Sequence, residues 1–211
     1  MPGAWEIEPD SLLAILIPYT DNTIVTLEWA IKLKKLIIPM NHFITIQKNL
    51  PIHVAREYMV EEALDKGATH ILCIDADVML PPWGLQVLLT HDYPIVSALY
   101  YRKSDPPTPA CWKKVKGKLQ LLKKEEVENK VVEVDAIGLG ACLIQAKVFE
   151  KIKKPWFDWT FKPGKGGYSE DLFFCRKARK AGFSIIVDGR VKCHHYGLGM
   201  VKQGKWTFAS Y

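Results

Sequence analysis

The sequence predicts an α/β protein with a mainly parallel sheet that is flanked by helices. Over residues 1–100, short apolar runs alternate with longer amphipathic stretches. Strands and helices that alternate in this way form parallel sheets covered by helices. Of the 211 residues, 48% are hydrophobic and 25% are charged, as in ordinary globular proteins. This composition excludes disordered, coiled-coil and collagen-like chains. At about 150 residues per domain, we expect a single domain over 1–211.

Four strands and three helices are expected in the first half. Apolar runs predict strands at 12–17, 43–46, 71–74 and 95–99. Amphipathic stretches predict helices at 23–36, 52–66 and 83–90. We expect Asp21 or Asn22 to be the N-cap of the first helix. Gly67 should end the second helix, and Pro81-Pro82 should begin the third.

The second half predicts a smaller mixed or antiparallel part. Residues 112–124, with Lys116-Gly117-Lys118 at their centre, predict a hairpin. Further strands are expected at 131–136, 141–145 and 185–187, together with a helix at 170–181 that ends at Gly182.

The cysteines and the charged residues indicate in which compartment the protein works and what kind of partner it could attract. The five cysteines are scattered, so we expect reduced thiols without disulfides, as in the cytoplasm. Net charge is +6, and residues 113–130 hold seven lysines and three glutamates. This positively charged segment is either a solvent-exposed hairpin without a partner or a surface that attracts an anionic partner. No apolar run approaches the roughly 18 residues of a membrane span, and the N-terminus does not read as a signal peptide.

Two aspartates follow the predicted third strand directly. Asp75 and Asp77 come after four buried apolar residues, and ligands of open α/β sheets bind beyond the carboxyl ends of strands. Carboxylates desolvated together repel each other unless a cation or donors compensate. Mg²⁺ or Mn²⁺ fits, because such ions take oxygen ligands and bridge to a diphosphate. The alternative is a turn with two solvated aspartates.

Two further polar clusters lie near the C-terminus. A glycine-rich loop at 163–167 precedes Ser169, a possible N-cap, and Glu170 and Asp171. These acids either complement the helix dipole or supply a general base beside a mobile lid. His194 and His195 follow the last predicted strand, where an imidazole could complete a metal site or be a hydrogen-bonded structural residue.

Together, these segments resemble a metal-dependent glycosyltransferase of the GT-A fold, family 2 type, over nearly the whole chain in the expected order. The matching segments are Pro18-Tyr19, Ala55-Arg56-Glu57, Asp75-Ala76-Asp77, the glycine-containing strand 138–144, Glu170-Asp171 with Phe174 and Arg176, and His195-Tyr196-Gly197. The length is similar to that of compact members encoded by viruses and phages.

The resemblance implies a Rossmann-like nucleotide-sugar half at 1–100 and an acceptor and catalytic half at 101–211. It implies a Mn²⁺ or Mg²⁺ site of Asp77, Asp75 and His195, in which Asp77 binds the ion directly and Asp75 contacts it through water or contacts the donor ribose; His194 is the less favoured histidine ligand. Pro18, Tyr19, Arg56, Asp75 and Asp77 would bind a UDP- or GDP-sugar donor. Asp171 would be the base of an inverting transfer, with Glu170 as its competitor.

The implied acceptor is a glycan, a protein or a lipid; modified DNA also stays open. The implied location is the cytoplasm, or the host cytoplasm for a viral protein. No stable nucleic-acid complex is expected.

One departure and two alternatives accompany this resemblance. Many family members have Asn where Glu57 stands, which puts a donor contact there in doubt. A sugar-phosphate nucleotidyltransferase is less favoured, because the segment after the first strand has neither glycine nor a basic residue. A basic nucleic-acid- or glycan-binding module on a degenerate scaffold has support only from the lysine-rich hairpin, which lacks interleaved aromatic residues.

Overall fold

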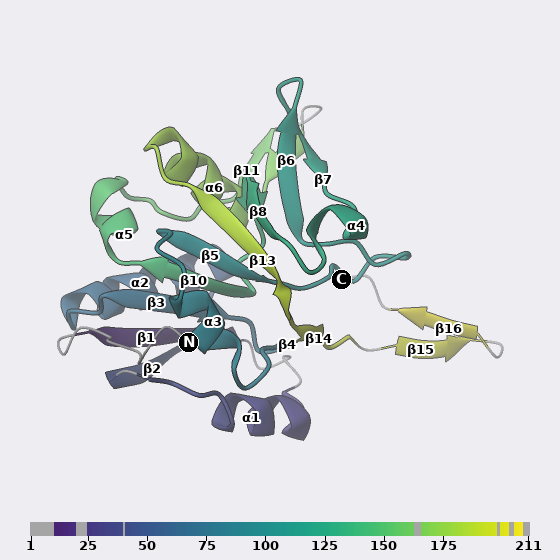
Figure 1. Ribbon diagram of the computed structural model, residues 1–211, viewed down its shortest axis with the longest axis horizontal. Coiled ribbons are helices and arrows are strands. Elements are labelled where there is room, and N and C mark those ends of the chain that lie inside the picture. Colours follow the sequence, from purple (N-terminus) through teal and green to yellow (C-terminus); the bar gives the residue numbers. More distant parts are fainter. Residues whose placement is uncertain are drawn as a thin grey trace.

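A seven-stranded sheet forms the centre of the protein (Figure 1). The computed structural model describes residues 11–19, 25–39, 41–162, 166–197, 199–202 and 205–208. The strand order is β2-β1-β3-β10-β5-β13-β8. The bounds are β1 (Leu12–Tyr19), β2 (Asn41–Lys48), β3 (His70–Ile74), β5 (Ile95–Leu99), β8 (Val131–Val134), β10 (Ala141–Gln145) and β13 (Ile185–Lys192).

The predicted mainly parallel sheet is confirmed, with two antiparallel exceptions. Strands β2, β1, β3, β5 and β13 run in one direction, and β10 and β8 run against them. Strand β10 comes from the second half of the chain and lies between β3 and β5. The first half therefore does not form a continuous parallel sheet by itself.

Helices cover both faces of the sheet. They are α1 (Leu27–Lys34), α2 (Ile52–Asp65), α3 (Gly84–Leu89), α4 (Lys124–Val127), α5 (Lys147–Lys151) and α6 (Glu170–Lys180). Buried side chains of α2, α5 and α6 join one core cluster, and those of α1 and α3 join the other. Along β1, Ala14 and Leu16 face the first cluster while Leu13 and Ile15 face the second, as the two-residue period of a strand requires.

The predicted first helix begins later than expected. Helix α1 starts at Leu27, and Thr26 is its N-cap because the Thr26 hydroxyl accepts a hydrogen bond from the Trp29 backbone N–H. The expected caps Asp21 and Asn22 lie outside the described residues. The helices predicted at 52–66, 83–90 and 170–181 are confirmed to within about a residue at each end.

Small sheets surround the central one. Strands β6 (Cys111–Val115) and β7 (Lys118–Leu121) form the predicted hairpin, with Lys116 and Gly117 in the left-handed region at its turn. The single strand predicted at 131–136 is wrong: it divides at Asp135 into β8 and β9 (Ala136–Ile137), which belong to different sheets. The break is held by Asp135, whose carboxylate accepts a hydrogen bond from the Lys114 N–H at 2.7 Å.

Three pairs of short strands complete the described part of the chain. Strand β4 (Val78–Met79) pairs with β14 (His194–His195), and β11 (Thr160–Lys162) pairs with β12 (Gly166–Tyr168). Strands β15 (Gly199–Lys202) and β16 (Lys205–Phe208) form a hairpin that extends away from the main body (Figure 1). All five cysteines are free, as expected, and all five are buried. Within the described ranges, no helix is long and apolar enough to cross a membrane.

Candidate active site

The polar clusters singled out in the sequence lie at one edge of the sheet. Strands β1, β3, β5 and β13 are parallel, so the segments that follow them meet at the same edge. Asp75 and Asp77 follow β3, Tyr100 to Lys103 follow β5, and His195 follows β13. Strand β10 is antiparallel, so the segment that precedes it, with Gly138 and Gly140, reaches this edge too. This edge is where open α/β sheets bind ligands.

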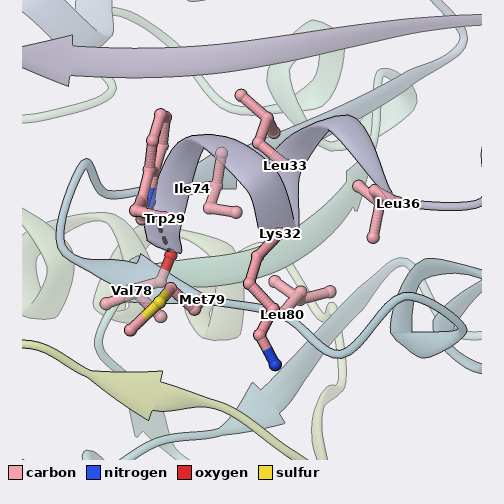
Figure 2. A pocket seen from close by; sticks show the side chains of 8 residues that line it. All are labelled: Trp29, Lys32, Leu33, Leu36, Ile74, Val78, Met79 and Leu80. Carbon is pink, nitrogen blue, oxygen red and sulfur yellow. Dashed lines mark hydrogen bonds between the residues drawn. The ribbon is translucent and has the colours of Figure 1, made fainter. Parts of the chain in front are cut away.

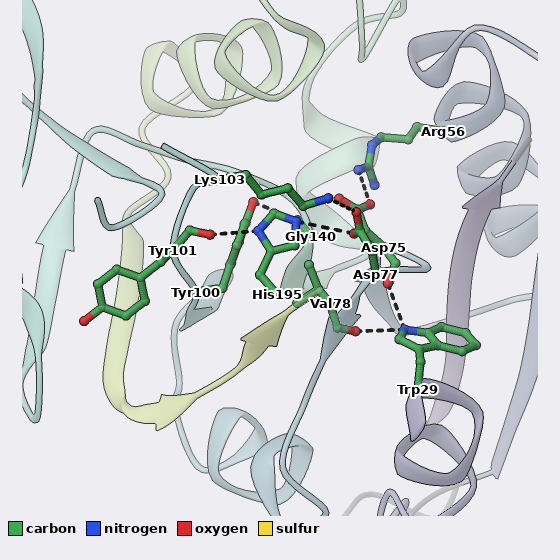
Figure 3. A network of polar contacts seen from close by, with 10 residues as sticks. All are labelled: Trp29, Arg56, Asp75, Asp77, Val78, Tyr100, Tyr101, Lys103, Gly140 and His195. Atoms are coloured by element: carbon green, nitrogen blue, oxygen red, sulfur yellow. Dashed lines mark hydrogen bonds and ion pairs between the residues drawn. The ribbon is translucent and has the colours of Figure 1, made fainter. Parts of the chain in front are cut away.

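Pairing between β4 and β14 brings Asp77 and His195 together (Figure 3). His195 is the Cα partner of Val78, and the Tyr196 N–H donates to the Asp77 carbonyl at 2.7 Å. As a result, His195 Nε2 lies 3.5 Å from Asp77 Oδ1. His194, the less favoured ligand, is exposed.

The imidazole of His195 is oriented by a backbone carbonyl. Its Nδ1 lies 2.7 Å from the Tyr101 carbonyl oxygen, which can only accept, so Nδ1 carries a proton. In the neutral ring, Nε2 then presents a lone pair toward Asp77. Two acceptors facing each other at this distance require a proton or a cation between them. A carbonyl that orients the second ring nitrogen is also the usual arrangement of a metal-binding histidine.

The Asp77 carboxylate is partly exposed and surrounded by positive groups. Lys103 Nζ lies 2.6 Å from Asp77 Oδ2, on the carboxylate oxygen that His195 does not face. Burial alone would raise the pKa of Asp77, but the interactions with His195 and Lys103 outweigh it and lower this pKa. The group is therefore an ionised carboxylate with its charge directed toward cations.

Arg56 contacts both acidic motifs, through Asp75 of the first and Glu170 of the second. Its side chain is only 2% exposed; Nη2 lies 2.7 Å from Asp75 Oδ1 and Nε lies 3.6 Å from Glu170 Oε1. The other Glu170 oxygen accepts a hydrogen bond from Trp159 Nε1 at 3.0 Å. In the described part of the chain, Arg56 Nε and Nη1 have no hydrogen-bond partner. The Coulomb attraction of Arg56 for Asp75 and Glu170 therefore ties together residues that are distant in the sequence.

Asp171 differs from Glu170 in its surroundings. Its Oδ1 accepts hydrogen bonds from the Ser169 hydroxyl and from the Leu172 N–H at 2.8 Å. Ser169 occupies the expected N-cap position, but its hydroxyl bonds to Asp171 and makes no cap bond to the backbone. Burial raises the pKa of Asp171, as it raises that of Glu170; the charge of Asp75 also raises the Asp171 pKa, whereas that of Arg56 lowers it. A carboxylate with a raised pKa is better matched to accepting a proton near neutral pH.

Two glycines allow close packing around Asp75 and Tyr100. The Asp75 N–H donates to the Gly140 carbonyl at 3.0 Å, and the Gly140 N–H donates to the Tyr100 hydroxyl at 3.2 Å. A Cβ on Gly140 would lie 3.0 Å from Asp75 Oδ2, and one on Gly138 would lie 1.9 Å from the Tyr100 oxygen. Tyr100 also packs edge-on against the His195 ring. The segment 138–140 thus supports both Asp75 and His195.

Replacing Gly138 with Ala is expected to destabilise the protein by about 1–3 kcal/mol, the usual range for overpacking. The added methyl group would meet the Tyr100 hydroxyl, which is buried and bonded to Gly140. The double variant Gly138→Ala/Tyr100→Phe should recover part of the loss, because the closest atom is removed. Chemical denaturation of the three variants measures this coupling. Strictly additive losses would contradict the proposed contact.

Trp29 holds the turn that carries both aspartates. Its indole Nε1 donates to the Asp75 carbonyl at 3.1 Å and to the Val78 carbonyl at 2.9 Å. A narrow apolar pocket lies beside Trp29, between α1 and the strand segment 78–80 (Figure 2). The turn is therefore fixed from the side of α1 as well as from β10.

The remaining predicted site residues have different surroundings. Pro18 is buried and Tyr19 half-buried at the end of β1, on the same edge as Asp75. Both Glu57 oxygens accept hydrogen bonds from the Trp156 N–H, and one also accepts from the Phe157 N–H. Glu57 thus fixes the backbone at Trp156 and Phe157. This structural role accounts for a carboxylate at this position, and no contact to a donor is needed. Of the loop predicted at 163–167, residues 163–165 lie outside the described residues, and Gly166 and Gly167 belong to β12.

Lys103, Tyr100 and Trp29 complete the site, and the sequence did not point to them. Each lies outside a recognisable motif. Lys103 and Trp29 reach the aspartate segment through the tertiary fold, and Tyr100 reaches Gly140 and His195. The only signal available was the position of Tyr100 and Lys103 just after the fourth predicted strand, at the edge where ligands bind.

The donor set fits a divalent ion with two ligands from the protein. Among the residues that the structure describes, no group of three or more His, Cys, Asp or Glu is arranged to hold a metal. Asp75 is engaged by Arg56, whereas Asp77 and His195 face each other across 3.5 Å. Mg²⁺ commonly takes one or two carboxylates and completes its shell with water and substrate phosphates. Asp77 and His195 suit such a shared site.

Comparison with known proteins relates the fold to glycosyltransferases. No protein-family profile matches the sequence, and no curated protein is similar to it in sequence. A197 from STIV is similar in structure, with a TM-score of 0.60, 21% identity, and coverage of 86% of this chain and 85% of that one. The catalytic domain of Drosophila beta1,4galactosyltransferase 7, in a complex with xylobiose, gives a TM-score of 0.53 and 13% identity over 86% of this chain and 66% of that one. At these identities the likeness shows the fold alone: this chain has a fold like that of a glycosyltransferase catalytic domain.

Proposed function

We propose that the protein is a metal-dependent glycosyltransferase that moves a sugar from a nucleoside-diphosphate sugar to an acceptor hydroxyl. The observation that carries the proposal is the meeting of Asp77 and His195, 3.5 Å apart, at the ligand-binding edge of the sheet. The glycosyltransferase-like fold supports it independently. Function follows from the site rather than from the fold, because one fold supports many activities.

Asp77 and His195 would hold Mn²⁺ or Mg²⁺. When bound there, the ion would supply the positive charge that a departing nucleoside diphosphate needs. The Tyr101 carbonyl keeps His195 Nε2 directed toward Asp77, and the backbone bond from Tyr196 to Asp77 fixes their separation. These contacts orient the ligands before any ion arrives, which reduces the entropic cost of binding.

Asp75 would contact the donor rather than serve as a second direct metal ligand. The Arg56 guanidinium engages Asp75 Oδ1 at 2.7 Å. Asp75 Oδ2 would then be the oxygen available to accept a hydrogen bond from a ribose hydroxyl. Because Arg56 is buried, it would act on the donor through Asp75. Pro18 and Tyr19 end the neighbouring strand and would border the nucleotide.

Asp171 would accept the proton of the acceptor hydroxyl in an inverting transfer. Its Oδ1 is occupied by the bonds from Ser169 and Leu172, which leaves Oδ2 to take the proton. Glu170 is less suited, because one oxygen bonds to Trp159 and the other faces Arg56. The proposed donor is a UDP- or GDP-sugar, and the acceptor a glycan, a protein or a lipid.

Calorimetry with UDP and GDP, with and without Mn²⁺, tests the proposal. We expect one of the two nucleotides to bind at least tenfold more tightly with Mn²⁺. We also expect Asp77→Asn to lose this enhancement, because an amide is a much weaker ligand for the ion. Asp135→Asn is the matched control, since Asp135 lies at the break between β8 and β9. Nucleotide binding that is absent, or that ignores Mn²⁺, would remove the support for the proposed site.

A further inference from the structure

Asp77 already has a positively charged partner in the protein itself. Lys103 Nζ lies 2.6 Å from Asp77 Oδ2, and both side chains are about a third exposed, at 30% and 31%. His195 Nε2 faces the other oxygen, Oδ1 (Figure 3). The lysine therefore occupies one oxygen of the carboxylate that the proposed function assigns to the divalent ion.

The segment that carries Lys103 is built to hold it there. The Arg102 N–H donates to the Thr108 carbonyl at 2.8 Å, and Ser104 Oγ donates to the Pro106 carbonyl at 2.9 Å. A Cβ on Gly197 would lie 3.5 Å from Lys103 Cδ, so the aliphatic stem of the lysine runs along this glycine. Lys103 thus belongs to a hydrogen-bonded segment that follows β5, and its side chain packs against Gly197, which follows β14.

A divalent ion and the Lys103 ammonium would repel each other if both stayed beside Asp77. Two like charges a few ångströms apart repel each other by about 1 kcal/mol or more, even when well solvated. Lys103 would have to leave Asp77 when an ion arrives. A nucleoside diphosphate would offer the released ammonium a new anionic partner next to the same site.

We infer that Lys103 is a built-in competitor of the divalent ion at Asp77 and that a bound diphosphate relieves this competition. The inference rests on the proposed function for the divalent ion at Asp77 and for the identity of the diphosphate, and the competition itself can be measured with Mn²⁺ alone. Ion and nucleotide then favour each other's binding, and this coupling is reciprocal. The lysine keeps Asp77 neutralised in the empty site and reserves tight ion binding for the nucleotide complex.

Mn²⁺ binding measured by electron paramagnetic resonance tests this without any transfer reaction. Wild type, Lys103→Met and Lys103→Arg are titrated with Mn²⁺ alone, then with UDP and with GDP. Lys103→Met should bind Mn²⁺ alone at least about fivefold more tightly than wild type, and the tightening by nucleotide should shrink; fivefold is the lower end of common coupling factors. Lys103→Arg keeps the charge and should behave like wild type.

Lys66→Met is the matched control, because Lys66 forms a similarly short ion pair with Glu62 at 2.5 Å on the surface of α2. It should leave Mn²⁺ binding unchanged. Equal or weaker Mn²⁺ binding by Lys103→Met, including no binding to either protein, overturns the inference. If Lys103→Met binds Mn²⁺ more tightly and no variant binds UDP or GDP, the competition stands and the proposed transferase function fails.

Discussion

Asp171→Asn is expected to lose sugar transfer by a factor of about 10²–10⁴ while it keeps donor binding, the range associated with a lost general base. The amide has the same shape as the carboxylate, and its oxygen can still accept the bonds from Ser169 and Leu172. It cannot take a proton from an acceptor hydroxyl. The measurements are the turnover rate with donor and acceptor, and the donor dissociation constant by calorimetry.

Glu170→Gln separates the two acidic neighbours. Glu170 is buried between Arg56 and Trp159, so its substitution should affect stability more than proton transfer. Full activity in Asp171→Asn together with loss in Glu170→Gln would assign the base to Glu170. The raised pKa of Asp171 adds a second signature, because a base works only when deprotonated. Turnover should therefore fall as the pH drops through a value above the usual aspartate range, and Asp171→Asn should lack this limb.

Arg56→Met is expected to lower the free energy of unfolding by about 3 kcal/mol, since removing one partner of a buried ion pair leaves the other charge uncompensated. Glu170 is 7% exposed and would lose its cation, and Asp75 would lose its closest donor. For a chain of this size, the melting temperature should fall by about 6–12 °C. Thermal and chemical denaturation measure both quantities.

Two further variants distinguish the role of Arg56 from simple packing. Arg179→Met breaks an ion pair of the same length, 2.7 Å to Glu133, on the surface, and should cost about 0–1 kcal/mol. Arg56→Met/Glu170→Gln removes a buried acid together with its cation and should recover part of the stability. A loss in Arg56→Met no larger than that in Arg179→Met would show that Arg56 does not hold the two acidic motifs together.

The fold and the proposed chemistry rest on different observations. The likeness to the galactosyltransferase domain concerns the arrangement of strands and helices. Asp77 with His195, and Arg56 with Asp75 and Glu170, are contacts within this chain. Asp77→Asn tests the first of these contacts and Arg56→Met the second, so the proposed activity can fail while the fold assignment stands.

Local sequence determined most strands of the central sheet, most helix ends and the position of the two aspartates. Buried strands are recognisable because their apolar residues are contiguous, and Asp75 and Asp77 follow such a run directly. The turn at Gly117 and the helix end at Gly182 could also be predicted, because glycine is the residue that most readily adopts a positive φ angle. Both glycines do adopt one. These features depend on interactions between residues close in the chain.

Only the tertiary structure decided which of these segments become neighbours. Hydrophobic periodicity indicates that a strand is buried, but it does not say that β10 enters between β3 and β5 or that β4 pairs with β14. It likewise could not show that Lys103 reaches Asp77 or that Glu57 holds a loop. Such contacts join residues far apart in the chain, and their formation depends on the packing of the whole sheet rather than on any local preference.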